Sequence, residues 1–387
     1  MRDACALVIG GGITGYSVIQ DLYGRGLRDI VLFDYYDKPA AFSNKLSAPY
    51  TRIGQKAPDL LRSIQELHRH YERIVVFPTA DGQVDNIFAI YGDIEPYCFL
   101  PLNRDDYLQC CNKYGQYAYC QRANVPYPES VLIESISDLE QLRELAYPII
   151  IKPTIRWDHK GTSVFRNLVF RTDDEVKANR PAIESFLEMG YSFLASEVIP
   201  GEAATNLYSY YAYRSPNGGI LNEWVSRKLS KYPNDFGVFS TVSNEAPAVV
   251  REQGRALIEK MDWVGIATAE FKYDSRDGRY KLMEVNLRNP MSGGLGRCTG
   301  VDLAAAQYLD AMGEAVPKQV QMTDKRIHYA YLRQEISNLL RRRGYQRTFT
   351  DVLLHSDRTH LAFWDPRDIK PFMVDMGYYI IKLGRQN

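Results

Sequence analysis

The 387-residue chain has little that would point to a secreted, membrane or nucleic-acid-binding protein. No apolar run approaches the length that spans a bilayer, and the run at residues 4–9 is too short for the core of a signal peptide. The 47 basic and 47 acidic residues cancel, so no overall charge favours nucleic acid or an anionic membrane. We therefore expect a cytoplasmic protein with neither nucleic acid nor a membrane as a partner.

Cysteine is also scarce and unpatterned. None of the six cysteines shows C-x-x-C spacing, and their density is far below that of a disulfide-stabilised secreted scaffold. We interpret them as reduced thiols that mostly pack: Cys5, Cys98, Cys110, Cys111, Cys120 and Cys298.

The first part of the chain alternates between apolar runs and a segment of helical spacing. Residues 4–9 are apolar and end in three glycines at 10–12, a helical pattern follows, and residues 30–33 are a second apolar run. This β-α-β order predicts an α/β layer with parallel strands, which we assign to residues 1–105. Its further predicted elements are a helix at 59–73 and strands at 74–77 and 87–90.

The next two hundred residues mix both kinds of element and predict an α+β arrangement. Residues 104–122 have the pattern of a helix, and the stretch 125–128, with two prolines, favours extended backbone after it. Beyond residue 317 we expect a basic helix at 327–343 and then short irregular pieces. The other predicted elements are strands at 147–152, 163–170, 193–199, 206–213 and 219–225, helices at 173–189 and 245–262, and a hairpin at 266–285.

That hairpin carries the strongest chemical signal. If its turn is centred on Asp277, Glu270 and Glu284 lie seven residues to either side and face each other across two antiparallel strands. Facing like charges destabilise a hairpin, so the arrangement makes sense chiefly with a cation between them. The two-residue period of a strand places Asn286 and Arg288 on the face of Glu284.

Oxygen ligands without histidine or thiolate suit Mg²⁺, which shares its coordination with substrate phosphates. Arg288 could then hold a phosphoryl oxygen through two hydrogen bonds. The alternative is a surface hairpin with solvated charges. The apolar residues around the two glutamates, in GIATAEF and KLMEVNL, favour the metal site.

Two further segments suit a nucleotide. The apolar strand 149–152 ends in Lys152, and the polar turn after it contains Lys160, so both ammonium groups could reach phosphates, although a lone strand-end lysine more often extends into water. The strand around residue 196 stops at a Pro-Gly turn between Glu197 and Glu202. Such a turn offers adenine an apolar slot with hydrogen bonds at its edge, and offers ribose an acceptor.

In order and spacing, these segments resemble the ATP-grasp superfamily, in particular its carboxylate–amine ligases related to D-alanine–D-alanine ligase and D-aspartate ligase. The resemblance covers residues 104–316, from CNKYGQYAYCQRANVPYPES through IIIKP and SEVIPGE to the metal hairpin. The block 227–237 looks like the family's basic strand and substrate loop, and residues 301–303 look like its G-V-D-L helix start.

The resemblance implies an ATP-grasp fold with a Rossmann-like domain at residues 1–105. The small lobe would comprise residues 106–196 and the metal and substrate lobe residues 197–316. A C-terminal extension, residues 317–387, would pack on the core.

The resemblance also implies a role for each matching residue. Arg288 would stabilise the transferred phosphoryl group, with Lys228 and Arg227 as further cations at the substrate. The metal ligands would be Glu270, Glu284 and Asn286, holding Mg²⁺ or Mn²⁺. The ATP ligands would be Lys113, Lys152, Lys160, Glu197, Val198, Ile199 and Glu202.

Two positions depart from the family's pattern. The loop after Lys152 contains a single glycine, so its closure over ATP is open. The usual N-P-R triplet reads Asn286-Leu287-Arg288, which keeps the arginine in its place.

The implied reaction activates a carboxylate as an acyl phosphate and joins it to an amine, with release of ADP and phosphate. Both substrates would be small molecules, at least one of them an amino acid or peptide, and the sequence does not identify them. A thiol or hydroxyl acceptor stays open. A homodimer is a further expectation, since relatives often form one.

Two other functions compete with the ligase. The pattern Gly10-x-Gly12-x-x-Gly15, with Asp34 ending the next strand, fits a dinucleotide fingerprint and would make the chain an oxidoreductase. That fingerprint explains nothing after residue 40, and ATP-grasp ligases resemble such folds in their first domain. A non-catalytic nucleotide-binding module is the other alternative, but the chain keeps all three metal-type residues and the arginine.

Overall fold

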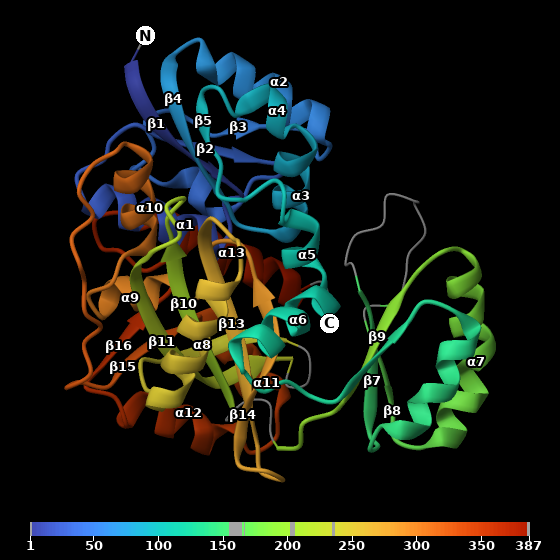
Figure 1. Cartoon of the computed structure of the whole chain (residues 1–387). Helices are drawn as coiled ribbons and strands as arrows, with labels where there is room; N and C mark the ends of the chain where they lie inside the picture. The colour runs from blue at the N-terminus through green and yellow to red at the C-terminus, as the bar shows by residue number, and fades with distance from the viewer. Residues whose placement is uncertain (1, 155–164, 166, 202–205, 234–236, 385–387) are drawn as a thin grey trace.

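The computed structural model of the chain contains three β-sheets with helices around them (Figure 1). It describes residues 2–154, 165, 167–201, 206–233 and 237–384.

Five parallel strands make the first sheet, in the order β3-β2-β1-β4-β5. The apolar run at residues 4–9 lies in the central strand β1, and its side chains are buried on both faces, as expected for a parallel strand between helices. This is the Rossmann-like domain that the sequence predicts. Its strands are β1 (Arg2–Ile9), β2 (Ile30–Asp34), β3 (Thr51–Arg52), β4 (Tyr71–Pro78) and β5 (Cys98–Phe99). Its helices are α1 (Ile13–Gly24), η1 (Pro39–Phe42), α2 (Ala57–His68), α3 (Asp81–Ala89) and α4 (Tyr91–Ile94).

A four-stranded antiparallel sheet forms a small separate unit, in the order β6-β9-β7-β8. Figure 1 shows this unit standing to the right of the rest, with α7 on its outer side. Its elements are β6 (Ser130–Ile133), η2 (Ile136–Glu144), β7 (Ile149–Pro153), β8 (Leu168–Phe170), α7 (Asp173–Glu188) and β9 (Phe193–Glu197).

The largest sheet has seven strands in the order β14-β13-β10-β11-β12-β15-β16. Its last two strands come from the predicted C-terminal extension, which therefore extends this sheet. The strands are β10 (Leu207–Arg214), β11 (Ile220–Tyr232), β12 (Val238–Ser243), β13 (Gly265–Asp274), β14 (Arg279–Asn286), β15 (Ile327–Ala330) and β16 (Arg358–Leu361). The helices of this half are α8 (Ala248–Lys260), α9 (Gly293–Cys298), α10 (Leu303–Ala311), α11 (Leu332–Arg341), α12 (Tyr345–Leu354) and α13 (Lys370–Gly384).

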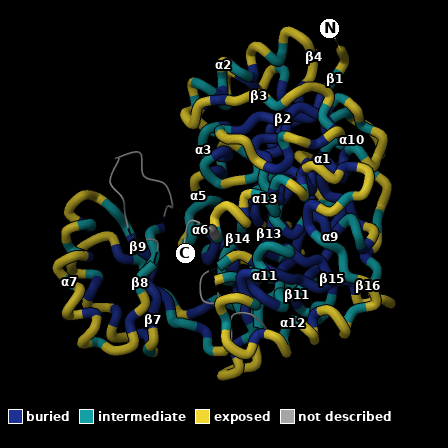
Figure 2. The backbone as a smooth tube through the Cα atoms, turned by 180° about the vertical axis from the view of Figure 1, so that it is seen from behind, coloured by how far each residue is buried: buried dark blue, intermediate teal, exposed yellow. Residues whose placement is uncertain are grey.

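The buried residues show which parts fold together. One apolar cluster contains Leu7 of β1 and Phe271 of β13, and a second contains Val8 of β1 and Trp224 of β11, so the first and largest sheets share their core. The third cluster contains only buried residues between Val131 and Ala195. Figure 2 shows the same division, with buried strands inside each part and exposed helix faces outside. The small unit therefore has its own core.

Two helices connect the Rossmann-like domain with the small unit: α5 (Tyr107–Cys111) and α6 (Lys113–Ala123). Both lie in the single helix predicted at 104–122. Asn112 separates them, because its side chain accepts the N–H groups of Tyr114 and Gly115 and so caps the second helix. Helix α6 packs against α8 and β14 of the large sheet.

Three predictions about secondary structure are wrong. Most of residues 87–90 belong to the helix α3. Its buried apolar residues, Val84 and Ile87, are spaced as on one face of a helix. The predicted helix at 327–343 begins as a strand, β15, which pairs with β12 and β16. The tail beyond it is not irregular but forms α12, β16 and α13.

These errors have a tertiary cause. The strands β15 and β16 exist by pairing with distant residues, which local pattern does not report. In addition, α13 leaves large apolar side chains such as Ile380 exposed, so its sequence lacks a clean amphipathic stripe.

The six cysteines are free thiols, and four of them are buried, as interpreted from the sequence. Among the helices within the described ranges, none is long and apolar enough to cross a bilayer.

Candidate active site

The predicted metal hairpin consists of β13 and β14, and Glu270 lies directly opposite Glu284. The register shifts between Glu270 and Phe271, which pairs with Leu282, so Met283 is an extra residue in β14. In a regular strand Leu282 and Glu284 would share a face. The bulge lets Leu282 point into the core while Glu284 joins Glu270 on the other face.

A cation already approaches this pair. The Lys228 Nζ on β11 lies 3.7 Å from the Glu270 Oε2, and both side chains are largely buried. Lys228, predicted as a cation at the substrate, therefore lies beside the Glu270 carboxylate. Its neighbour Arg227 pairs with Tyr208, which also pairs with Phe271, so Arg227 points to the opposite face of the sheet. The structure does not bring Arg227 to the two carboxylates.

Asn286 and Arg288 follow at the end of β14. The Arg288 Nη2 donates to the Asn286 Oδ1 at 3.2 Å, so the predicted metal amide and the predicted phosphoryl arginine are in contact. The Arg288 Nε donates to the Asp81 Oδ1 at 2.6 Å. Asp81 begins α3 of the Rossmann-like domain, and the sequence analysis missed it. Its position after the apolar run 74–77 was the available signal, because parallel strands present binding residues at their carboxyl ends.

The edge of β14 is held by a side chain. The Gln116 amide of α6 donates to the Val285 carbonyl at 2.9 Å and accepts the Val285 N–H at 2.8 Å. It takes the place of a neighbouring strand beside the metal-site residues. Nothing in the sequence pattern around Gln116 indicated this role.

The predicted adenine segment lies between the small unit and the large sheet. The Glu197 Oε1 accepts the Ala146 N–H at 3.0 Å, and its Oε2 pairs with Arg276 at the tip of the metal hairpin, also at 3.0 Å. The Val198 N–H donates to the Pro148 carbonyl at 2.8 Å. The Glu197 side chain and the Val198 N–H therefore brace the segment, which leaves the Val198 carbonyl and Ile199 as its candidate contacts to a base.

A buried lysine that the sequence analysis missed lies under this segment. The Lys272 Nζ on β13 donates to the Ile199 carbonyl at 2.6 Å, and the side chain faces the same side of the strand as Glu270. Burial lowers the pKa of the Lys272 ammonium. One strand thus carries a predicted metal ligand and holds the predicted adenine segment.

The predicted phosphate lysines come from the small unit and from the connecting helix α6. Lys152 lies at the end of β7, opposite Leu194 of β9. Lys113, the first residue of α6, donates its Nζ to the carbonyl of Pro153, the residue after Lys152. Lys160 and Glu202 lie outside the described residues.

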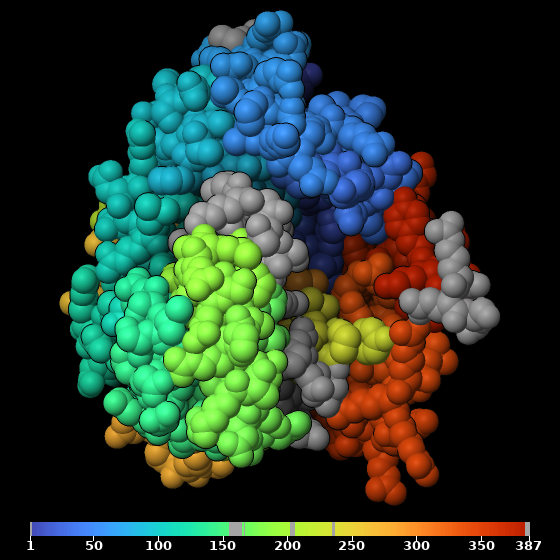
Figure 3. All heavy atoms as spheres, turned by 90° about the vertical axis from the view of Figure 1, so that its right-hand side faces the viewer, coloured from blue at the N-terminus to red at the C-terminus, as the bar shows by residue number. Residues whose placement is uncertain are grey.

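These parts meet around a hollow surface. Figure 3 shows the hollow between the small unit in green and the yellow to orange-red second half of the chain, below the blue Rossmann-like domain. Within the described residues no group of three or more His, Cys, Asp or Glu side chains could hold a metal. The site instead combines two carboxylates with one amide, a set that leaves positions for phosphate and water.

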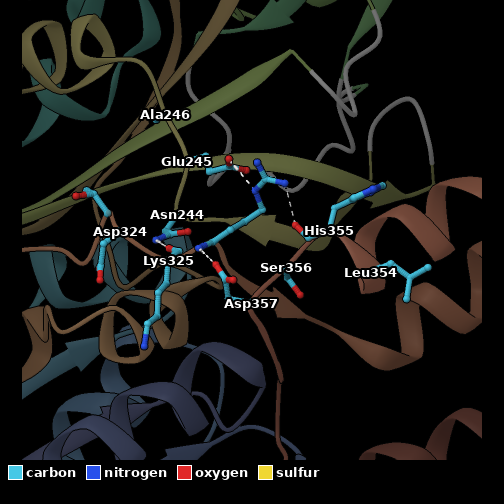
Figure 4. A pocket seen from close by; sticks show the side chains of 11 residues that line it. Asn244, Glu245, Ala246, Asp324, Lys325, Leu354, His355, Ser356 and Asp357 are labelled. Atoms are coloured by element: carbon cyan, nitrogen blue, oxygen red, sulfur yellow. Dashed lines mark hydrogen bonds and ion pairs between the residues drawn. The ribbon is translucent and has the colours of Figure 1, made fainter.

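A pocket of about 570 Å³ lies elsewhere and contains none of the predicted residues. Figure 4 shows dashed contacts at Glu245, His355 and Asp357, whereas the side chains of Asp324 and Lys325 have none. Arg326 donates to Glu245 at 2.9 Å and to the His355 carbonyl at 3.0 Å, and its N–H donates to Asp357. Arg326 is therefore held by its neighbours, and none of the predicted site residues lines this pocket.

The comparisons with known proteins agree with this geometry. Residues 239–319, which include β13 and β14, match the family model of the carbamoyl-phosphate synthase L chain, ATP binding domain. The D-aspartate ligase of Enterococcus faecium (strain Aus0004) is 22% identical over 245 residues, which are 60% of this chain and 57% of that ligase. The match thus spans little more than half of the curated relative.

Solved structures match over most of the chain. The ADP complex of PurK, N5-carboxyaminoimidazole ribonucleotide synthetase, has a TM-score of 0.66 at 17% identity and covers 88% of this chain and 85% of its own. Biotin carboxylase from Campylobacter jejuni has a TM-score of 0.64 at 15% identity, covering 82% and 73%. The chain therefore has the ATP-grasp fold, and the resemblance to the ATP-grasp superfamily that its motifs predict is confirmed.

Proposed function

We propose that this chain is an ATP-dependent ligase that activates a carboxylate as an acyl phosphate and joins it to an amine. The observation that carries the proposal is the pairing of Glu270 with Glu284, next to Asn286 and Arg288. The resemblance to D-aspartate ligase supports an amino acid as one of the two substrates. ADP and phosphate would be the other products.

The donor set fits Mg²⁺. Two carboxylates facing each other across a hairpin repel, and a divalent cation between them removes that cost. Hard oxygen donors without imidazole or thiolate suit Mg²⁺ and accommodate Mn²⁺. When bound, the metal would neutralise the charge of the β- and γ-phosphates.

The residues of the chain would then bind and orient the nucleotide. Lys113 offers positive charge from α6 and Lys152 from the small unit, and the Val198 carbonyl and Ile199 N–H offer hydrogen bonds to the base. Lys228 and Arg288 bring positive charge to the reacting end. No protein nucleophile is needed, so the rate enhancement would come from positioning and electrostatics. Water must be excluded from the acyl phosphate, since hydrolysis would waste it.

The dinucleotide alternative loses support at the glycine loop. The Asp34 carboxylate accepts the Gly11 N–H at 2.5 Å and the Tyr35 N–H at 2.6 Å, so it holds the loop instead of facing a ribose. A Cβ atom at Gly15 would lie 1.9 Å from the Gly10 carbonyl oxygen. The close packing of α1 against the end of β1 is therefore sufficient to require glycine at this position. Asp34 and Gly15 of the fingerprint are therefore explained without a bound dinucleotide.

The test is ADP release across pairs of amino acids, with mass spectrometry of the products. One pair should release ADP only with Mg²⁺, and the Glu284→Gln variant should lose this activity. Glu259→Gln, on the exposed face of α8, is the matched control and should behave like the unmodified protein. Equal ADP release by the Glu284→Gln variant would contradict the proposal.

The intermediate has its own test. With a carboxylate substrate labelled with ¹⁸O, the released phosphate should carry one ¹⁸O atom, because that oxygen bridges carbon and phosphorus in an acyl phosphate. Unlabelled phosphate would show that the carboxylate is not phosphorylated.

A further inference from the structure

The contact between Asp81 and Arg288 joins two parts of the chain that are 207 residues apart. Asp81 stands at the first position of α3, immediately beyond the carboxyl end of β4. Arg288 follows β14 and is the residue proposed to stabilise the transferred phosphoryl group. Neither the family motifs nor the proposed function uses Asp81.

The guanidinium of Arg288 is held at two of its three nitrogens. Its Nε donates to Asp81 at 2.6 Å and its Nη2 donates to Asn286 at 3.2 Å. A guanidinium is planar and has five N–H donors in a fixed geometry, so two such bonds set both its position and its plane. Within the described part of the chain, its other N–H groups have no hydrogen-bond acceptor. They are the donors that a phosphoryl group could use.

The pair differs from an ordinary surface ion pair, which contributes little because both side chains must be ordered. The side chains are only 18% exposed for Arg288 and 32% exposed for Asp81. In addition, the backbones on either side are already joined. The Asn289 N–H and its side-chain amide both donate to the Pro78 carbonyl, at 3.3 and 3.0 Å. Little further ordering is needed to form the ion pair.

We propose that Asp81 is a positioning residue that orients Arg288 toward the transferring phosphoryl group. The inference rests on the proposed function. Asp81 lies on the Rossmann-like domain, whereas Asn286 lies on the metal strand. The guanidinium is therefore held between the two domains, and its Nη groups are presented before any ligand arrives. Preorganised charge of this kind acts on the transition state more than on the binding of ATP.

The first experiment compares turnover and ATP affinity in Asp81 variants. Asp81→Ala should lower kcat by about 10–100-fold, the usual cost of losing a group that orients a reacting side chain, and should leave the KM for ATP within about threefold. Asp81→Glu, which keeps the charge, should recover part of the loss. A raised KM with normal kcat, or no recovery by glutamate, would overturn the positioning role.

The control is Asp85 on the same helix, one turn later, whose carboxylate accepts the Tyr107 hydroxyl. Asp85→Ala removes a comparable contact from α3 without touching Arg288, and kcat should stay unchanged. An equal fall in kcat for the two variants would mean that any damage to α3 lowers turnover, and it would overturn the inference.

A double-mutant cycle separates Asp81 from the proposed function itself. If Asp81 acts through Arg288, then Asp81→Ala should change kcat less than about threefold in an Arg288→Ala background, since residues that act as a unit are non-additive. A full additional loss would overturn the inference and leave the ligase intact. Normal turnover of Arg288→Ala alone would instead contradict the role of Arg288 in the proposed function.

Discussion

Glu270 and Glu284 face each other across β13 and β14 because the extra residue Met283 turns Glu284 away from the core. Opposed carboxylates on one face of a hairpin cost stability. A divalent cation between the two carboxylates would remove this cost, as the proposed function requires.

The destabilisation caused by the two opposed carboxylates can be measured without substrate. In EDTA, Glu284→Gln should unfold at the same or slightly higher urea concentration than the unmodified protein, because one of two opposed charges is gone. Saturating Mg²⁺ and ADP should then stabilise the unmodified protein more than the variant. A clear loss of stability for the variant in EDTA would show that the carboxylate is structural.

The predicted adenine segment gives a second prediction. Lys272→Met removes the ammonium that holds the Ile199 carbonyl, so ADP should bind several-fold more weakly while kcat at saturating ATP changes little. The matched control is Lys281→Met. Lys281 lies opposite Lys272 but pairs with Asp274 and Asp277 at 2.8 Å, so its loss should leave ADP affinity unchanged. Equal affinity losses in both variants would point to general damage of the hairpin.

The tip of the hairpin predicts a dependence on pH. Asp274 is fully buried, and its contacts with Arg276 and Lys281 hold the pKa of its carboxyl far below the ordinary value of 3.8. The pKa of Asp274 is lower in the folded than in the unfolded state. Its contribution to the free energy of unfolding is therefore complete above about pH 4 and is lost as the pH falls toward the folded-state pKa. Asp274→Asn should cost about 1.5–3 kcal/mol at pH 7, as expected for hydrogen bonds to a charged group.

Urea denaturation of the unmodified protein and of Asp274→Asn across a range of pH checks the direction of this pKa shift. The difference in unfolding free energy between them should be constant from pH 7 to about pH 5 and should narrow below pH 4. A difference that widens at low pH would contradict the depressed pKa.

A fourth prediction concerns the glycine loop. NADH should not bind, as judged by its fluorescence during a titration, since Asp34 is engaged with Gly11 and Tyr35. Asp34→Ala should lower stability, because these N–H groups then lose a buried acceptor. Saturable NADH binding that the Asp34 variant loses would revive the oxidoreductase alternative.

Local pattern was sufficient for much of the site. The hairpin with its acidic residues at matching distances was predicted from the turn and the strand period alone, and the structure pairs the predicted residues. Even so, a turn centred on Asp277 does not by itself produce this pairing. The strands pair Asp274 with Arg279, which in a regular ladder would set Met283 opposite Glu270, and the bulge restores the predicted pairing.

Contacts between distant segments could not be predicted in this way. The bonds from Asp81 to Arg288, from Gln116 to Val285 and from Lys272 to Ile199 each depend on how separate elements pack. The same holds for β15 and β16, which become strands only by joining the large sheet. The role of Arg227 was carried over from the resemblance, although its neighbour Lys228 necessarily takes the opposite face of the strand.

The central claim is that the carboxylates of Glu270 and Glu284 hold a metal ion that in turn holds the nucleotide. Calorimetric titration with ADP, with and without Mg²⁺, tests it without knowledge of the substrates. Mg²⁺ should strengthen ADP binding to the unmodified protein at least tenfold and should have little effect on ADP binding to Glu284→Gln. The same Mg²⁺ dependence in both proteins, or none in either, would contradict it.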